Sequence, residues 1–142
     1  MSKNPLTNVN VGSKETLVSP QRLARSLPLG PIAAAAVLES RRTAQAVLER
    51  SDPRLMVVVG PCSIHDLDGA REYARRLRAL ADEVDDTLVL LMRVYFEKPR
   101  TTIGWKGLIN DPHMDDSFRI EEGLRLSRGL LIEFAKMGLP AT

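Results

Sequence analysis

The stretch "RLMVVVG", Arg54 to Gly60, decides the fold. Its central residues, Leu55 to Val59, are all apolar, and three of the five are valines. Gly60 and Pro61 end the run. A short continuous apolar run of this kind is typical of a strand buried on both faces, as in a parallel sheet. We therefore expect a buried strand at residues 55–59.

The same pattern recurs in "TLVLLMRV", Thr87 to Val94, which predicts a second buried strand. Before the first strand, an Ala-rich segment without Gly or Pro predicts a helix from Ile32 to Arg50. Between the strands, Asp68 is a candidate N-cap for an amphipathic helix over residues 68–84. Its apolar stripe is Ala70, Tyr73, Ala74, Leu77, Leu80 and Val84.

A long loop, Tyr95 to Asp116, follows the second strand. Ser117 is the candidate N-cap of a third helix. Gly138 and Pro140 provide its stop signal. The expected apolar stripe of this helix is Ile120, Leu124, Leu131 and Phe134.

Helices and strands thus alternate, which favours an α/β fold with a parallel sheet. Two strands alone would leave open apolar edges. A (β/α)₈ barrel typically needs about 250 residues, whereas this chain has 142 and stops at "GLPAT", where a third strand would begin. We expect residues 32–142 to form the first βα units of an incomplete (β/α)₈ barrel. Residues 1–31, polar and punctuated by Pro and Gly, are expected to form an extended N-terminal arm with short ordered pieces.

Composition excludes several classes of protein. Twenty Lys and Arg against 18 Asp and Glu give a net charge of +2, which argues against a nucleic-acid binder. No apolar run reaches the roughly 18 residues of a membrane helix. The single cysteine excludes an internal disulfide framework. Because the N-terminal residues lack the apolar core of a signal peptide, we expect a cytoplasmic protein.

Two segments follow the strands directly: "GPCSIHD", residues 60–66, and "RVYFEKPRTTIGWKG", residues 93–107. In parallel α/β folds, ligands bind at the carboxyl ends of the strands. We therefore expect both segments to lie on one ligand-binding rim.

Cys62 has two interpretations. As a thiolate it could ligate a divalent metal or act as a nucleophile. As a lone cysteine it could instead be a small buried residue, which is the commoner case. His65 and His113 do not stand at a diagnostic metal-site spacing from Cys62, so the pattern alone leaves the alternatives open.

The second segment gathers positive charge beside a strand. Arg93 has the parity of the apolar residues two and four positions earlier, so its guanidinium would lie over the core and need an anion. That anion could be a carboxylate of the protein or a bound phosphate. Lys98, Arg100 and Thr101 add a point charge, a second guanidinium and a hydroxyl. A solvated charged face remains the alternative, and Trp105 could stack on a ligand or anchor the loop.

These segments also carry a family resemblance. "VVVGPCSIHD", "EYARRL" and "MRVYFEKPRTTIGWKGLINDPHMDDSF" closely resemble the class I 3-deoxy-D-arabino-heptulosonate 7-phosphate (DAHP) synthases. The resemblance implies a (β/α)₈ barrel with an N-terminal extension. It implies that phosphoenolpyruvate condenses with erythrose 4-phosphate, giving DAHP and phosphate in aromatic amino acid biosynthesis. It also implies a divalent metal such as Mn²⁺ or Fe²⁺, a dimer or tetramer, and feedback inhibition by an aromatic amino acid.

By position in the motifs, Cys62 matches the family's cysteine metal ligand. Arg93 matches a residue of the phosphoenolpyruvate site, and Lys98 matches the catalytic lysine that reaches both substrates. Arg100 and Thr101 match the site for the phosphate of erythrose 4-phosphate. The family's other metal ligands, a His, a Glu and an Asp, lie beyond residue 142. The resemblance places regulatory and subunit contacts in the arm.

Two alternatives accompany this hypothesis. One is a related phosphoenolpyruvate-dependent synthase of the 3-deoxy-octulosonate 8-phosphate type. The other is a stand-alone, non-catalytic module, suggested by the missing part of the barrel.

Overall fold

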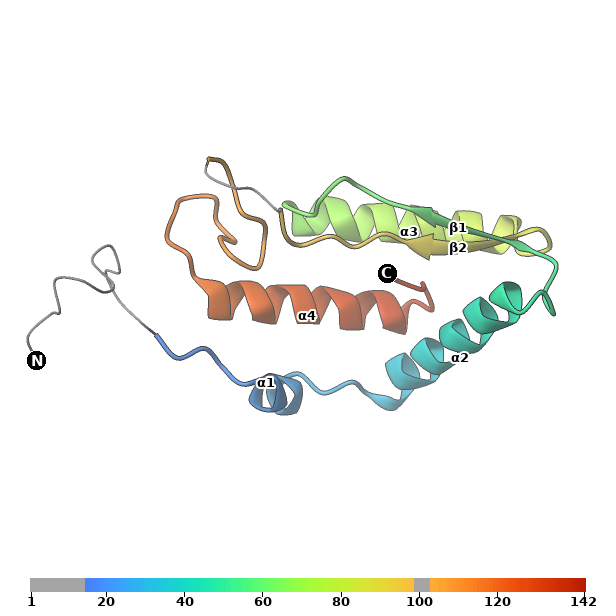
Figure 1. The fold of residues 1–142 in the computed structure, drawn as a ribbon, viewed down its shortest axis with the longest axis horizontal. Coiled ribbons are helices and arrows are strands. Elements are labelled where there is room, and N and C mark those ends of the chain that lie inside the picture. The colour runs from blue at the N-terminus through green and yellow to red at the C-terminus, as the bar shows by residue number, and fades with distance from the viewer. Residues whose placement is uncertain (1–14, 99–102) are drawn as a thin grey trace, which may run out of the picture.

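The computed structural model describes residues 15–98 and 103–142. The elements are, in order, α1 (Pro20–Ser26), α2 (Pro31–Leu48), β1 (Leu55–Val59), α3 (Leu67–Glu83), β2 (Leu88–Met92) and α4 (Ile120–Lys136) (Figure 1). The expected α/β alternation is confirmed, and each helix and strand predicted after residue 31 is present. The short helix α1 lies in the arm, and Ser19 is its N-cap, since the Ser19 hydroxyl accepts the amide N–H of Arg22.

β1 and β2 form a parallel pair, in register from Leu55 beside Leu88 to Val59 beside Met92. α3 runs along the pair (Figure 1) and covers one face of it. The core under α3 also takes residues from α4 and from the segments that follow the strands, so that the loops are anchored in the same core as the sheet. Its members with the least exposure include Ile64, Ala74, Met92, Leu108, Leu130 and Phe134.

The last residues of the chain pair with the other edge of β2. The amide N–H of Met92 donates to Pro140 O at 2.7 Å, and that of Thr142 donates to Met92 O at 2.9 Å. Met92 and Ala141 form a parallel bridge. The expectation that a third strand is about to begin at "GLPAT" is thus supported by a first parallel contact.

The expectation that the first strand is buried on both faces is wrong for β1. Leu55 is 66% exposed and Val58 is 51% exposed. In β2, by contrast, Val89, Leu90 and Met92 are buried. The difference follows from position in the sheet. β2 has chain on both sides, whereas β1 pairs only with β2 among the described residues.

Two predicted N-caps are also wrong. α3 begins two residues early because the carboxylate of Asp66, not Asp68, is the cap, and it accepts the amide N–H of Asp68 at 3.0 Å. Ser117 does not cap α4. Its amide N–H donates to the Asp115 carboxylate, and the helix starts after Arg119 without a side-chain cap. In both cases an earlier Asp closes a local Asx turn, which competes with the expected cap.

The buried stripe of α4 differs from the predicted one. Leu131 is 40% exposed, whereas Leu130 is 1% exposed. The face turned inward carries Gly123, Ser127, Leu130 and Phe134, again at three- and four-residue steps. Gly123 fixes this rotation, because it lies against the backbone of the preceding loop. A Cβ at this position would lie 2.2 Å from Ile109 O.

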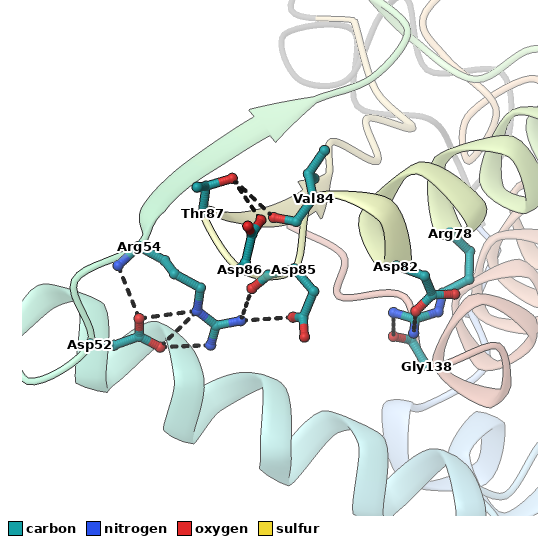
Figure 2. A network of polar contacts seen from close by, with 9 residues as sticks. All are labelled: Asp52, Arg54, Arg78, Asp82, Val84, Asp85, Asp86, Thr87 and Gly138. Carbon is teal, nitrogen blue, oxygen red and sulfur yellow. Dashed lines mark hydrogen bonds and ion pairs between the residues drawn. The ribbon is translucent and has the colours of Figure 1, made fainter.

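At the opposite end of the strands, Arg54 ties the start of β1 to the turn before β2 (Figure 2). Its guanidinium donates to both carboxylate oxygens of Asp52, and to the carbonyl and carboxylate of Asp85 at 3.0 and 2.8 Å. These partners raise the pKa of Arg54, and Arg54 lowers the pKa of Asp52. Beside this network, Arg78 of α3 binds Asp82 and the carbonyl of Gly138, linking α3 to the end of α4.

We expect Gly123→Ala to destabilise the fold by about 2 kcal/mol or more, because the added methyl group overpacks the contact with the loop backbone. Gly129→Ala is the matched control in the same helix. A Cβ there meets nothing within 4 Å, so this variant should gain about 0.5–1 kcal/mol from helix propensity. Urea unfolding of both variants measures the difference. Equal stability of the two would contradict the proposed contact.

Candidate functional site

The two segments after the strands meet, as expected. The amide N–H of Ile64 donates to Tyr95 O at 2.9 Å. Arg93 Nη1 donates to Pro61 O at 2.9 Å and to Cys62 O at 2.8 Å. Gly60 allows the approach, because a Cβ there would lie 2.4 Å from Arg93 O. The prediction of a shared rim at the carboxyl ends of β1 and β2 is confirmed.

Among the described residues, no carboxylate contacts Arg93, although one interpretation required such a partner. In the described part of the chain its guanidinium contacts the two carbonyl oxygens of the first segment and lies 4.8 Å from the Tyr95 ring centroid. Carbonyls and an aromatic face orient a guanidinium without neutralising its charge. The arrangement thus presents a fixed positive group at the rim, suited to a bound anion.

Cys62 is exposed, so its interpretation as a small buried residue is wrong. Lys98 Nζ lies 3.0 Å from Cys62 Sγ and donates to it. This hydrogen bond and the charge of Lys98, helped by Arg93, lower the pKa of the Cys62 thiol below its ordinary value. The contact brings together a sulfur and a lysine that stand far apart in sequence and favours the thiolate, the form that ligates metals.

The loop that carries Lys98 is closed at its base. The amide N–H of Lys98 donates to Lys106 O at 2.8 Å, and Glu97 forms an antiparallel bridge with Gly107. Arg100 and Thr101, the expected contacts for the sugar phosphate, lie outside the described residues.

Neither histidine joins Cys62. His113 Nε2 lies 3.1 Å from a carboxylate oxygen of Glu122, and His65 contacts the Trp105 ring edge-on. Residues 15–98 and 103–142 contain no group of three or more His, Cys, Asp or Glu that could hold a metal ion. Cys62 therefore fits one soft ligand of a metal, and the described residues do not complete a ligand set.

Asp111, in the loop before α4, is a buried carboxylate, 2% exposed, that the sequence pattern does not indicate. Nothing in "LINDPHMD" marks this Asp as buried, because aspartates in polar loops are usually solvated. Of the two roles considered for Trp105, stacking on a ligand or anchoring the loop, the structure favours anchoring the loop. Its indole N–H donates to Asp111 O at 2.6 Å.

None of the helices in the described ranges is long and apolar enough to span a bilayer.

Several known proteins are similar to this chain. Residues 33–141 match the family model described as the DAHP synthetase I family. The Tyr-sensitive phospho-2-dehydro-3-deoxyheptonate aldolase of Escherichia coli K12 is 54% identical over 140 residues. That match covers 99% of this chain and 39% of the relative. The Phe-sensitive aldolase of the same strain is 54% identical over 125 residues, covering 88% of this chain and 36% of that protein.

A solved structure of the same kind of enzyme is also similar to this chain. The phospho-2-dehydro-3-deoxyheptonate aldolase of Francisella tularensis SCHU S4 superposes with a TM-score of 0.88 at 45% identity, covering 93% of this chain and 39% of that chain. The chain thus spans about two fifths of the length of the relatives it matches. The matched motifs include both rim segments. The chain belongs to the DAHP synthetase I family.

Proposed function

We propose that the protein carrying this chain condenses phosphoenolpyruvate with D-erythrose 4-phosphate to give DAHP and phosphate, the first step of aromatic amino acid biosynthesis. The observation that carries the proposal is the contact of Lys98 Nζ with Cys62 Sγ at 3.0 Å, beside Arg93, at the carboxyl ends of two parallel strands. Membership of the family supports the same reaction.

The electrostatics suit two anionic substrates. Together the substrates carry two phosphates and a carboxylate, which repel one another unless fixed cations offset the repulsion. We assign Arg93 to phosphoenolpyruvate, since its guanidinium is already oriented by the carbonyls of Pro61 and Cys62. We assign Lys98 as the catalytic residue that contacts both substrates, and Arg100 and Thr101 as the binding site for the phosphate of the sugar.

We propose Cys62 as one ligand of a divalent metal such as Mn²⁺ or Fe²⁺. The lowered pKa of the Cys62 thiol supports this role, because metals bind the thiolate. The remaining ligands would come from residues other than those described. When bound, the ion would supply Lewis acidity at the aldehyde oxygen of the sugar. The cations of the chain hold the substrates in place for the new carbon–carbon bond.

We propose that residues 32–142 are the first βα units of a (β/α)₈ barrel and that residues 1–31 form an arm outside it. Three features support this. The sheet is parallel, the residues after Gly138 begin to pair with the free edge of β2, and Val58 exposes an apolar side chain on the face opposite α3. Further barrel strands would cover that face.

We further propose regulation by an aromatic amino acid and assembly into a dimer or tetramer, with the arm as the contact region. The relatives include Tyr-, Phe- and Trp-sensitive aldolases, at 54%, 54% and 49% identity, so identity does not select the amino acid. The octulosonate alternative is not favoured, because these relatives are all heptonate aldolases. A cytoplasmic location remains a prediction from the sequence.

Lys98→Ala, introduced into the complete enzyme, should lower turnover about 100-fold or more, because a preorganised cation at the reacting groups is lost. The measurement is release of phosphate from phosphoenolpyruvate in the presence of erythrose 4-phosphate. Lys136→Ala, which removes a lysine from the last turn of α4, is the control and should keep normal turnover. Near-normal turnover of Lys98→Ala would overturn the assignment.

Lys98→Met should also slow the alkylation of Cys62 at neutral pH. Lys98 lowers the pKa of the Cys62 thiol, so its removal raises that pKa and leaves less thiolate to react. In metal-free protein, the pH at half-maximal rate of iodoacetamide labelling, followed by mass spectrometry of the Cys62 peptide, should move upward. Lys106→Met removes the same charge from the same loop as a control. An unchanged pH profile in Lys98→Met would contradict the contact.

A further inference from the structure

We propose that Trp105 is a positioning residue for the site. Its indole fixes the base of the loop that carries Lys98, and so sets where the Lys98 ammonium lies relative to the Cys62 segment. The inference deepens the proposed function and rests on it, but the loop geometry can be measured without any assay of activity.

Trp105 makes contacts in two directions. Its indole N–H donates to Asp111 O at 2.6 Å, on the chain that leads toward α4. Its ring stands edge-on to His65, with centroids 6.4 Å apart and planes at 85°. His65 belongs to the segment after β1, three residues beyond Cys62. One half-buried side chain therefore joins the second rim segment to the first and to the loop behind it.

The acceptor of the indole bond is rigid. Asp111 is 2% exposed, and its amide N–H donates to Gly107 O at 2.9 Å. Its Oδ2 accepts the amide N–H of Asp116 at 3.2 Å, while Oδ1 is buried with no partner in the described part of the chain. These hydrogen bonds restrain the backbone on both sides of the Asp111 carbonyl. The Asp111 carbonyl is thus held from both sides.

A displacement of Trp105 would also displace Lys98, because the residue after Trp105 is hydrogen-bonded to the Lys98 backbone. The next residue, Lys106, provides the carbonyl that accepts the Lys98 amide N–H at 2.8 Å. Beyond it, Gly107 has a φ of +111°, and a Cβ there would lie 2.2 Å from Phe96 O. The backbones at Gly107 and at Phe96 are in such close contact that no side chain fits between them. The base of the loop therefore moves as a unit. Two side-chain hydrogen bonds orient this base: the short bond from the Trp105 indole N–H to Asp111 O at 2.6 Å, and a longer one from Asn110 Nδ2 to Lys106 O at 3.4 Å.

Trp105→Phe is the sharp test in the complete enzyme, because it keeps an aromatic ring beside His65 and deletes the N–H donor. We expect the KM for erythrose 4-phosphate to rise about fivefold, the size of one lost neutral hydrogen bond. The proposed contacts for that substrate follow Lys98 in the same loop. The KM for phosphoenolpyruvate should rise less than that for erythrose 4-phosphate, because Lys98 shares phosphoenolpyruvate with Arg93, which is held by its own bonds to Pro61 O and Cys62 O.

Val84→Ala is the control for simple loss of stability. Val84 packs against the core at the far end of α3, so this variant should lower the melting temperature and leave both KM values unchanged. An equal rise of both KM values in Trp105→Phe, or no rise, would overturn the positioning role. If the unmodified enzyme lacks synthase activity, the proposed function fails, and the exchange measurement below still decides the role of Trp105.

Hydrogen exchange provides a readout apart from activity. In the unmodified protein the amide N–H groups of Lys98 and Asp111 should exchange slowly, since both are donors in the closed base of the loop. In Trp105→Phe the Lys98 amide should exchange about fivefold faster, while amides of β2 keep their rates. Fast exchange of the Lys98 amide in the unmodified protein would overturn the inference, even if Trp105→Phe failed to fold.

Discussion

Parallel pairing of β1 with β2 brings Gly60 against the backbone of Arg93, and the candidate site depends on this contact. The amide N–H of Arg93 continues the ladder by donating to Val59 O at 2.8 Å. Any side chain at position 60 would collide with Arg93 O. Because the strands run in the same direction and end at the same level, the segments that follow them leave the sheet side by side. Cys62 and Lys98 can then touch.

The positive character of the site is a local property. The chain as a whole has a net charge of +2, and several of its arginines are used in ion pairs between or along helices, such as Arg71 with Glu133. Arg93 and Lys98 are different, since their side-chain contacts among the described residues are carbonyl oxygens, the Tyr95 ring and the sulfur of Cys62, and none is a carboxylate. Cations without a carboxylate partner retain the capacity to bind an anionic substrate, which is the requirement of the proposed reaction.

The rim is supported from several sides. Arg54 fixes the opposite ends of both strands through Asp52 and Asp85. Gly123 lets α4 press against the loop backbone at Ile109. The Arg54 contacts fix the strands from which the rim segments leave, and the Gly123 contact lies against the backbone of the loop that follows Lys98. Rigid placement of charged groups is worth more to a reaction between two anions than additional charge on a loose loop.

Much of the fold and the position of the rim could be predicted from the sequence, because the patterns that indicate them involve residues close together in the chain. The apolar runs at Leu55 and Leu88 and the period of α3 identify the elements, and strand direction alone places the two segments on one rim. Helix starts were harder, because Asp66 and Asp115 compete with the expected caps through turns. The rotation of α4 was also missed, since the small residue Gly123 carries no hydrophobic signal and its role appears only when the loop packs against it.

Local patterns in the sequence are enough to predict the alternation of helices and strands, the parallel sheet, and the residue types that line the rim. Which of those residues meet depends on the folded chain. The contact of Lys98 with Cys62 joins positions 36 residues apart, and the bond from the Trp105 indole to the carbonyl of the buried Asp111 depends on a loop that closes on itself. The difference lies in the distance along the chain over which each effect acts. Periodicity and turn chemistry involve residues a few positions apart, whereas the lowered pKa of Cys62 and the position of Lys98 depend on groups that only folding brings together.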